Sequence, residues 1–214
     1  MGLRGLAKEF MTIDPRIRFF RQPVNEGPFR NFQFVLEQSR GEFFMWAADY
    51  DKREAYFIDR CLKEFAQNEA NPAEVAMEAR YFDDSGLFDF FPEGRPFYGN
   101  APDSIMMQLS HMLRHNYGNL FYSLFRRSVL FRDRRSFFEC VPIRSLNEIS
   151  LFLFVVEQGG WKVIPDIGLY KKSRAGTVRQ AKWQIEGGKK ASLLRAGLIP
   201  FLSMLKYHYD AYKR

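Results

Sequence analysis

The sequence has few of the residues that build disulfide frameworks or Cys/His metal centres. Its 214 residues include two cysteines, Cys61 and Cys140, and three histidines. Neither cysteine has another Cys or a His at metal-ligand spacing. Two isolated thiols fit a reducing compartment, so we expect a cytoplasmic protein. His111 and His115 stand at i and i+4 on an expected helix, but no third ligand is evident, and we interpret them as ordinary helix residues.

Long apolar runs are also missing. No stretch reaches the roughly 18 apolar residues that a transmembrane helix needs, and residues 1–10 lack the apolar core of a signal peptide. Hydrophobic residues make up 46% and charged residues 27% of the chain, and 23 Phe contribute to an aromatic content of 17%. This composition is typical of one globular α/β domain with a substantial core.

Most of the chain lacks an excess of basic charge. Lys171 to Arg214 contains 11 Lys/Arg and 2 Asp/Glu, whereas the other 170 residues contain 21 and 23. The formal net charge of +7 is therefore a property of the tail. A body without a basic surface argues against nucleic acid as a partner.

Hydrophobic periodicity predicts alternating strands and helices. We expect a helix to end near residue 12, and other helices at 28–39, 55–68, 104–114, 147–157, from about 178, and 189–207. Strands are expected at 17–20, 43–48, 75–82, 120–125, 161–164 and 168–171. Strand–helix alternation in the first third predicts a parallel, doubly wound sheet with ligands at the carboxyl ends of its strands.

Asp49 and Asp51 follow the apolar run 43–48. Two carboxylates at i and i+2 after a buried strand can turn toward one Mg²⁺ or Mn²⁺, which prefer oxygen ligands. The alternative is a solvated turn with Asp51 as a helix N-cap, since Asp-x-Asp pairs also occur by chance in loops. Trp46, just before them, is expected in the core rather than as a platform for a sugar ring.

The neighbouring motifs favour a site. They follow one another closely: DPRIRFFRQ at 14–22, NEG at 25–27, FRNF at 29–32, RGEFF at 40–44 and WAADYD at 46–51. This run resembles the middle of a family 2 glycosyltransferase of the GT-A fold. Looser similarity continues through GNLFYSLFRRS at 118–128, NE at 147–148, GGW at 159–161 and VIPDIGLY at 163–170.

The resemblance implies an inverting transfer of a sugar from a nucleoside-diphosphate sugar to the hydroxyl of a saccharide or lipid-linked acceptor. Asp49 and Asp51 match the positions that hold the divalent metal (Mg²⁺ or Mn²⁺) and the diphosphate. Glu148 matches the general base, where the family more often has Asp; a first-turn Glu favoured by the helix dipole is the alternative.

The resemblance also assigns nucleotide-binding positions. Arg30 matches an Arg near the nucleotide, with a surface salt bridge as the alternative. Asn25 and Gly27 match the turn before it, where Gly27 is expected to be needed for its backbone conformation.

Nothing before Asp14 resembles the family's first two strands, which hold the base and ribose. We therefore expect a GT-A-like mixed sheet flanked by helices that lacks its first strands and leaves a neighbouring strand edge exposed. The expected organisation is a partial glycosyltransferase domain at 1–175, with a remnant of the nucleotide-binding half at 1–52 and the acceptor half at 53–175, and a basic helical tail at 176–214. Weak or absent donor binding by this chain follows from the same expectation.

The tail is amphipathic. Leucines and Phe201 recur at helical spacing between basic residues, which suits a helix lying on an anionic membrane. It equally suits a helix packed on the domain. The tail supports the alternative function, a non-catalytic glycosyltransferase-like binding module at the inner face of the membrane.

Overall fold

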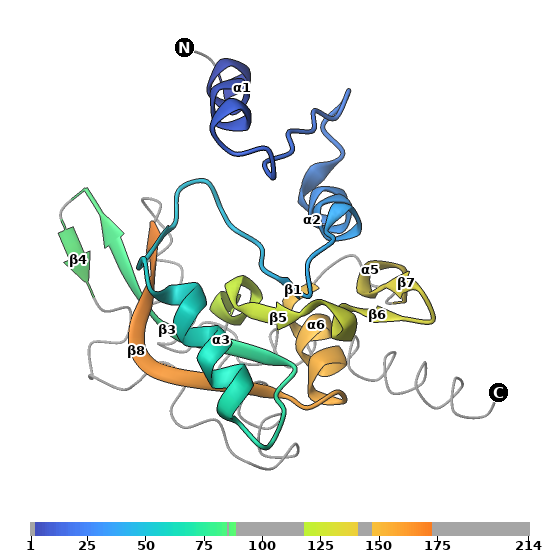
Figure 1. Ribbon diagram of the computed structural model, residues 1–214, viewed down its shortest axis with the longest axis vertical. Coiled ribbons are helices and arrows are strands. Elements are labelled where there is room, and N and C mark those ends of the chain that lie inside the picture. The colour runs from blue at the N-terminus through green and yellow to red at the C-terminus, as the bar shows by residue number, and fades with distance from the viewer. Residues whose placement is uncertain (1–2, 85, 89–117, 141–146, 173–214) are drawn as a thin grey trace, which may run out of the picture.

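The computed structural model describes residues 3–84, 86–88, 118–140 and 147–172. They form a mixed α/β fold in which a strongly curved sheet is flanked by helices (Figure 1). Within these ranges no helix is long and apolar enough to cross a bilayer. The helix expected at 104–114, with His111 and His115, and the expected tail at 176–214 lie outside the described residues.

The main sheet has the order β1-β5-β3-β8-β2, with β4 paired to β3. Only the β3–β8 pair is parallel, whereas the other pairs are antiparallel. The prediction of a mixed sheet with flanking helices is confirmed, but the prediction of a parallel, doubly wound sheet is wrong. The strands are β1 (Phe43–Phe44), β2 (Lys52–Arg53), β3 (Glu74–Asp83), β4 (Gly86–Phe88), β5 (Leu124–Arg126) and β8 (Trp161–Lys172).

The pair β3–β8 forms the long central ladder. The strand expected at 75–82 is confirmed as β3, whose first five residues are all buried, and a tight turn connects it to β4. The two strands expected at 161–164 and 168–171 are one continuous strand, β8. The register shifts twice between Met77 and Ala79, where the partner residues jump from Ile164 to Ile167 and then to Leu169. These bulges accommodate Pro165, which has no N–H to donate to the ladder.

Helix α3 (Phe57–Gln67) covers the ladder in Figure 1. Phe57, Cys61 and Phe65 are buried against side chains of β3, β5 and β8. Ile58 and Leu62 are apolar residues of the same helix, but both side chains are exposed. Each lies one position beyond a buried residue, a rotation of about 100° around the helix.

A second cluster joins α2 (Gly27–Gln38), α5 (Phe137–Cys140) and α6 (Asn147–Val156). Trp46 lies at its centre, is 2% exposed, and stacks on Phe121 with ring centroids 4.4 Å apart. Its assignment to the core is confirmed. Two short 3₁₀ helices, η1 (Gly118–Tyr122) and η2 (Arg127–Leu130), and the hairpin β6 (Phe131–Arg132)–β7 (Arg135–Ser136) complete this part.

Three expected strands need correction. Residues 17–20 are extended but pair with no strand, so this strand is wrong. The strand at 43–48 is reduced to β1, because the chain leaves the sheet after Phe44. The strand at 120–125 begins late, since residues up to Tyr122 form η1. The expected first helix is present as α1 (Leu3–Ile13), which stands apart from the sheet in Figure 1.

Candidate functional site

Asp49 and Asp51 lie on the loop between β1 and β2. The Asp51 N–H donates to the Ala48 oxygen at 3.4 Å, which makes the chain turn. The Arg53 side chain then donates from Nη2 to the oxygens of Trp46, at 3.0 Å, and Tyr122, at 3.3 Å. The loop is therefore held in place by the buried core residue before it and by η1.

The Asp51 carboxylate is shielded from solvent and lacks a well-formed hydrogen bond. Neither of its oxygens has a partner in acceptable geometry, although both are buried. Burial raises the pKa of Asp51 and the charge of Asp49 adds to the rise, while Lys171, the Lys172 backbone N–H and Arg53 oppose it. An orphaned carboxylate of this kind leaves its oxygens available to a cation.

Two cationic side chains lie beside this carboxylate. Arg53 approaches the ring of Phe57, and burial lowers the pKa of its guanidinium. Lys171 lies near the end of β8 and reaches the loop because β2 pairs with β8. Its ammonium lies 4.1 Å from the centre of the Tyr122 ring. The loop thus combines two carboxylates, which can hold a divalent metal, with cations suited to phosphate oxygens.

Among the described residues, Asp49 and Asp51 are the acidic side chains that would hold the metal. In the part of the chain that the structure describes, no three His, Cys, Asp or Glu side chains come together as a metal centre. Mg²⁺ commonly binds through one or two carboxylates and completes its shell with water and substrate phosphates. The unpartnered Asp51 oxygens and exposed Asp49 fit such an ion.

The other expected binding residues lie around the start of α2. Asn25 accepts the Gly27 N–H at 3.0 Å through Oδ1, and Gly27 has a φ of +83°, as its expected need for a left-handed conformation requires. A Cβ at Gly27 would meet no atom within 4 Å, so conformation and not space selects glycine. Arg30 is exposed and donates to Gln33 at 3.1 Å.

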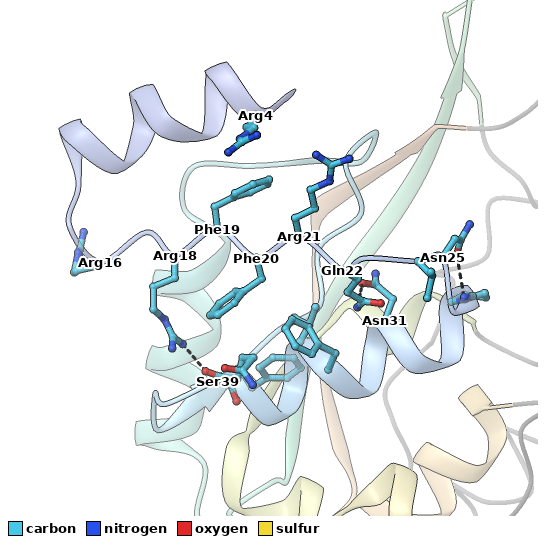
Figure 2. Close-up of a pocket in the computed structure, with 17 residues that line it drawn as sticks. Arg4, Arg16, Arg18, Phe19, Phe20, Arg21, Gln22, Asn25, Asn31 and Ser39 are labelled. Atoms are coloured by element: carbon cyan, nitrogen blue, oxygen red, sulfur yellow. Dashed lines mark hydrogen bonds between the residues drawn. The ribbon is translucent and has the colours of Figure 1, made fainter. Parts of the chain in front are cut away.

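Asn25 and Gly27 line an open groove of about 980 Å³ between α1, residues 16–22 and α2 (Figure 2). Neither Arg30 nor the aspartates contribute to its lining. The structure therefore separates the expected residues into the Asp49–Asp51 loop and the Asn25–Gly27 turn. Glu148 is the second residue of α6, but its side chain lies outside the described part of the structure.

Sequence reasoning missed three charged residues. Lys171 meets Asp51 through the β2–β8 pairing, which no local motif indicates, whereas Arg53 follows Asp51 closely in the sequence. Glu74, the first residue of β3, is fully buried and neither of its oxygens has a hydrogen-bond partner. Burial raises the pKa of Glu74 well above its ordinary value, and the Ser123 hydroxyl nearby does not offset this rise. Glu74 stands just before the strand expected at 75–82, and the sequence gave no signal of its burial.

Compared with models of protein families, the chain matches none, and no curated protein sequence matches it. The resemblance carried by residues 14–51 therefore stays a prediction.

Proposed function

We propose that the chain is a glycosyltransferase-like domain of the GT-A type that binds the metal–diphosphate part of a nucleotide sugar at the Asp49–Asp51 loop. The observation that carries this proposal is the buried Asp51 carboxylate, which has Arg53 and the Lys172 backbone N–H nearby but no hydrogen bond of good geometry to either oxygen. A cation on these oxygens would satisfy them.

The surrounding side chains suit the rest of the donor. Asp49 is exposed at the same turn and supplies a second carboxylate. Lys171 and Arg53 add positive charge at the place where a diphosphate would lie against the metal. When bound, the metal would neutralise the charge that develops on the leaving diphosphate. Asn25, Gly27 and Arg30 are proposed to contact the nucleotide.

The reaction in this proposal is a direct displacement. The acceptor hydroxyl attacks the anomeric carbon and its proton passes to the carboxylate of Glu148, while the bond from the anomeric carbon to the phosphate oxygen breaks and the nucleoside diphosphate leaves. One displacement inverts the configuration at the anomeric carbon. The role of Glu148 rests on its sequence position at the start of α6.

Saturation-transfer NMR tests the proposal, because it detects even the weak binding that we expect of this chain. UDP-, GDP- and dTDP-sugars are offered with MgCl₂ or with EDTA. We expect one nucleotide class to give signals only with Mg²⁺, and these to be lost in Asp51→Asn. Asp59→Asn, which changes an exposed aspartate on α3, is the matched control and should keep them. Equal signals with EDTA, or none from any donor, contradict the proposal.

A transfer assay separates the enzyme from the alternative binding module. Nucleoside diphosphate released on addition of saccharide acceptors, and lost in Glu148→Gln, supports catalysis. If the unchanged chain and Glu148→Gln both bind the donor only with metal and neither releases nucleoside diphosphate, the chain is a binding module.

A further inference from the structure

Residues 17–22 have the side-chain alternation of a β-strand. Arg18 bonds the Gln38 oxygen at the end of α2. Phe20 meets Phe34 edge to face at 5.5 Å, and Gln22 donates to Asn31 Oδ1 at 3.3 Å. Every second side chain is thus fixed on α2, as Figure 2 shows. Contacts from every second side chain are what an extended strand makes when it lies along a helix.

The opposite side chains of this segment face away from α2. In Figure 2, Phe19 and Arg21 extend toward α1, from which Arg4 reaches into the same space. The main chain of the segment pairs with no strand among the described residues. The Ile17 N–H bonds the Asp14 oxygen at 3.1 Å, but within the described ranges residues 18–22 make no backbone–backbone hydrogen bond. A strand-like segment with free donors and acceptors is a template for another strand.

Within the described part of the sheet, β1 leaves a second strand edge unpaired beside the same groove. β1 is the terminal strand in the order of the sheet, and its Phe44 lines the groove together with Phe19 and Phe20. The Arg127 N–H donates to the Glu42 oxygen at 2.8 Å on the β5 side. Because main-chain groups alternate in direction along a strand, those of Phe43 point away from β5, toward the open edge.

The surface of this groove is apolar and positively charged. Phe19 and Phe20 are 41% and 46% exposed, and Val24 and Val35 are exposed beside them. Four arginines and no acidic residue line the groove. Asp14 pairs with Arg16, which holds the Asp14 pKa at about 2. The remaining three, Arg4, Arg18 and Arg21, have no carboxylate partner among the described residues.

We propose that this groove binds an extended acidic segment of another protein, which adds as a strand beside residues 17–22. Main-chain hydrogen bonds to the segment give affinity, apolar side chains of the partner cover Phe19 and Val35, and its carboxylates pair with Arg4 and Arg21. A second copy of this chain suits the groove poorly, since its own residues 16–22 would bring three more arginines to the same place. The proposal concerns a protein partner and goes beyond the proposed function.

Selection from a phage-displayed library of random peptides on the intact chain tests the proposal. We expect the selected peptides to combine Asp or Glu with β-branched or aromatic residues and to lack proline at their centres. Arg21→Glu, and the double variant with Arg4→Glu, should weaken their binding at least about tenfold, the effect of losing roughly 1.4 kcal/mol. Lys8→Glu changes a charge on α1 outside the groove lining and should leave binding unchanged.

Backbone pairing is tested by peptide chemistry and amide exchange. Two versions of the best peptide are N-methylated, one at its odd and one at its even positions. Only one version should lose binding, because a strand forms hydrogen bonds to its neighbour through alternate residues. The N–H groups of residues 18–22 should exchange more slowly with the peptide bound. Three results would each overturn the proposal. The selected peptides could bind the arginine variants as tightly as the unchanged chain, or the selection could yield no binding peptide. The third is a dimer of the chain that protects these same amides without peptide.

Discussion

The Arg53 guanidinium donates a hydrogen bond to the main-chain oxygen of Trp46 at 3.0 Å and so closes the loop that carries Asp49 and Asp51. Trp46 is fixed in the aromatic core, and Arg53 is fixed on β2 by its pairing with β8. The position of the two carboxylates is therefore set by residues that belong to the packing of the fold.

Replacing Arg53 tests this closure. Arg53→Met cannot donate to the Trp46 and Tyr122 oxygens, so we expect the free energy of unfolding to fall by about 2 to 3 kcal/mol, the range for lost hydrogen bonds to a charged group. Chemical denaturation measures the change. Arg60→Met removes an exposed ion pair with Asp166 and should cost less than about 1 kcal/mol. Equal losses in the two variants would show that Arg53 does not hold the loop.

Gly159 and Gly86 form a matched pair for a second prediction. Their φ values, +126° and +124°, are nearly equal and unfavourable for any residue with a side chain. A Cβ at Gly159 would lie 2.8 Å from the Asn71 oxygen, whereas one at Gly86 would meet nothing within 4 Å. Both alanine variants should lose about 1 to 3 kcal/mol from backbone strain, and Gly159→Ala should lose clearly more. Thermal denaturation of both variants gives the comparison, and a smaller loss for Gly159→Ala would contradict it.

Glu74 makes stability depend on pH. Its folded pKa lies well above the ordinary 4.5, so between these two values the native state holds a proton that the unfolded state releases. This contribution is complete below pH 4.5 and is lost as pH rises through the folded pKa, with a slope of up to about 1.4 kcal/mol per pH unit.

Glu74→Gln removes the titrating group, so its free energy of unfolding should fall less steeply above pH 4.5 than that of the unchanged chain. Glu69→Gln, at an exposed glutamate, should keep the original slope. Urea titrations over a pH series measure these slopes. Identical slopes for Glu74→Gln and the unchanged chain would mean that Glu74 ionises freely in the folded state.

The parts of the fold that sequence predicts well are those in which apolar residues are grouped or spaced in a recognisable pattern. α2, α3, α6 and β3 were expected within one to three residues of their bounds, because their apolar residues recur at helical or strand spacing. Pairing was predicted poorly. Residues 17–20 have strand composition, but a strand also needs a neighbour, and none of the described strands lies beside it. The continuity of β8 through Pro165 depends on bulges that only the β3 register reveals.

In the candidate site, too, sequence predicts the local motifs but not the contacts between distant residues. The Asn25–Gly27 turn and the Asp49–Asp51 pair are local motifs, and a sequence displays them. Lys171 reaches Asp51 across more than half of the chain through sheet pairing, and the groove brings Arg4 of α1 to Arg18 and Arg21 of the following segment. Such groupings depend on tertiary contacts and have no signature in the spacing of residues.

The tail carries a prediction from sequence alone, since residues 173–214 lie outside the described structure. Its basic, apolar pattern predicts that the chain co-sediments with anionic phosphatidylserine vesicles at low salt and is released as salt rises, because the Lys and Arg attraction is screened. Neutral phosphatidylcholine vesicles are the control. A chain that stays in the supernatant with anionic vesicles at low salt would show that the apolar face of the tail is not available to lipid.

We propose that the Asp51 carboxylate, with Asp49, holds a divalent cation together with a diphosphate. Paramagnetic broadening of backbone amide signals by Mn²⁺ tests it most directly. We predict selective broadening around residues 48–53 and 170–172, stronger after addition of a nucleoside diphosphate, lost in Asp51→Asn and retained in Asp59→Asn. Broadening that is spread over the surface, or that is the same in Asp51→Asn, would contradict the claim.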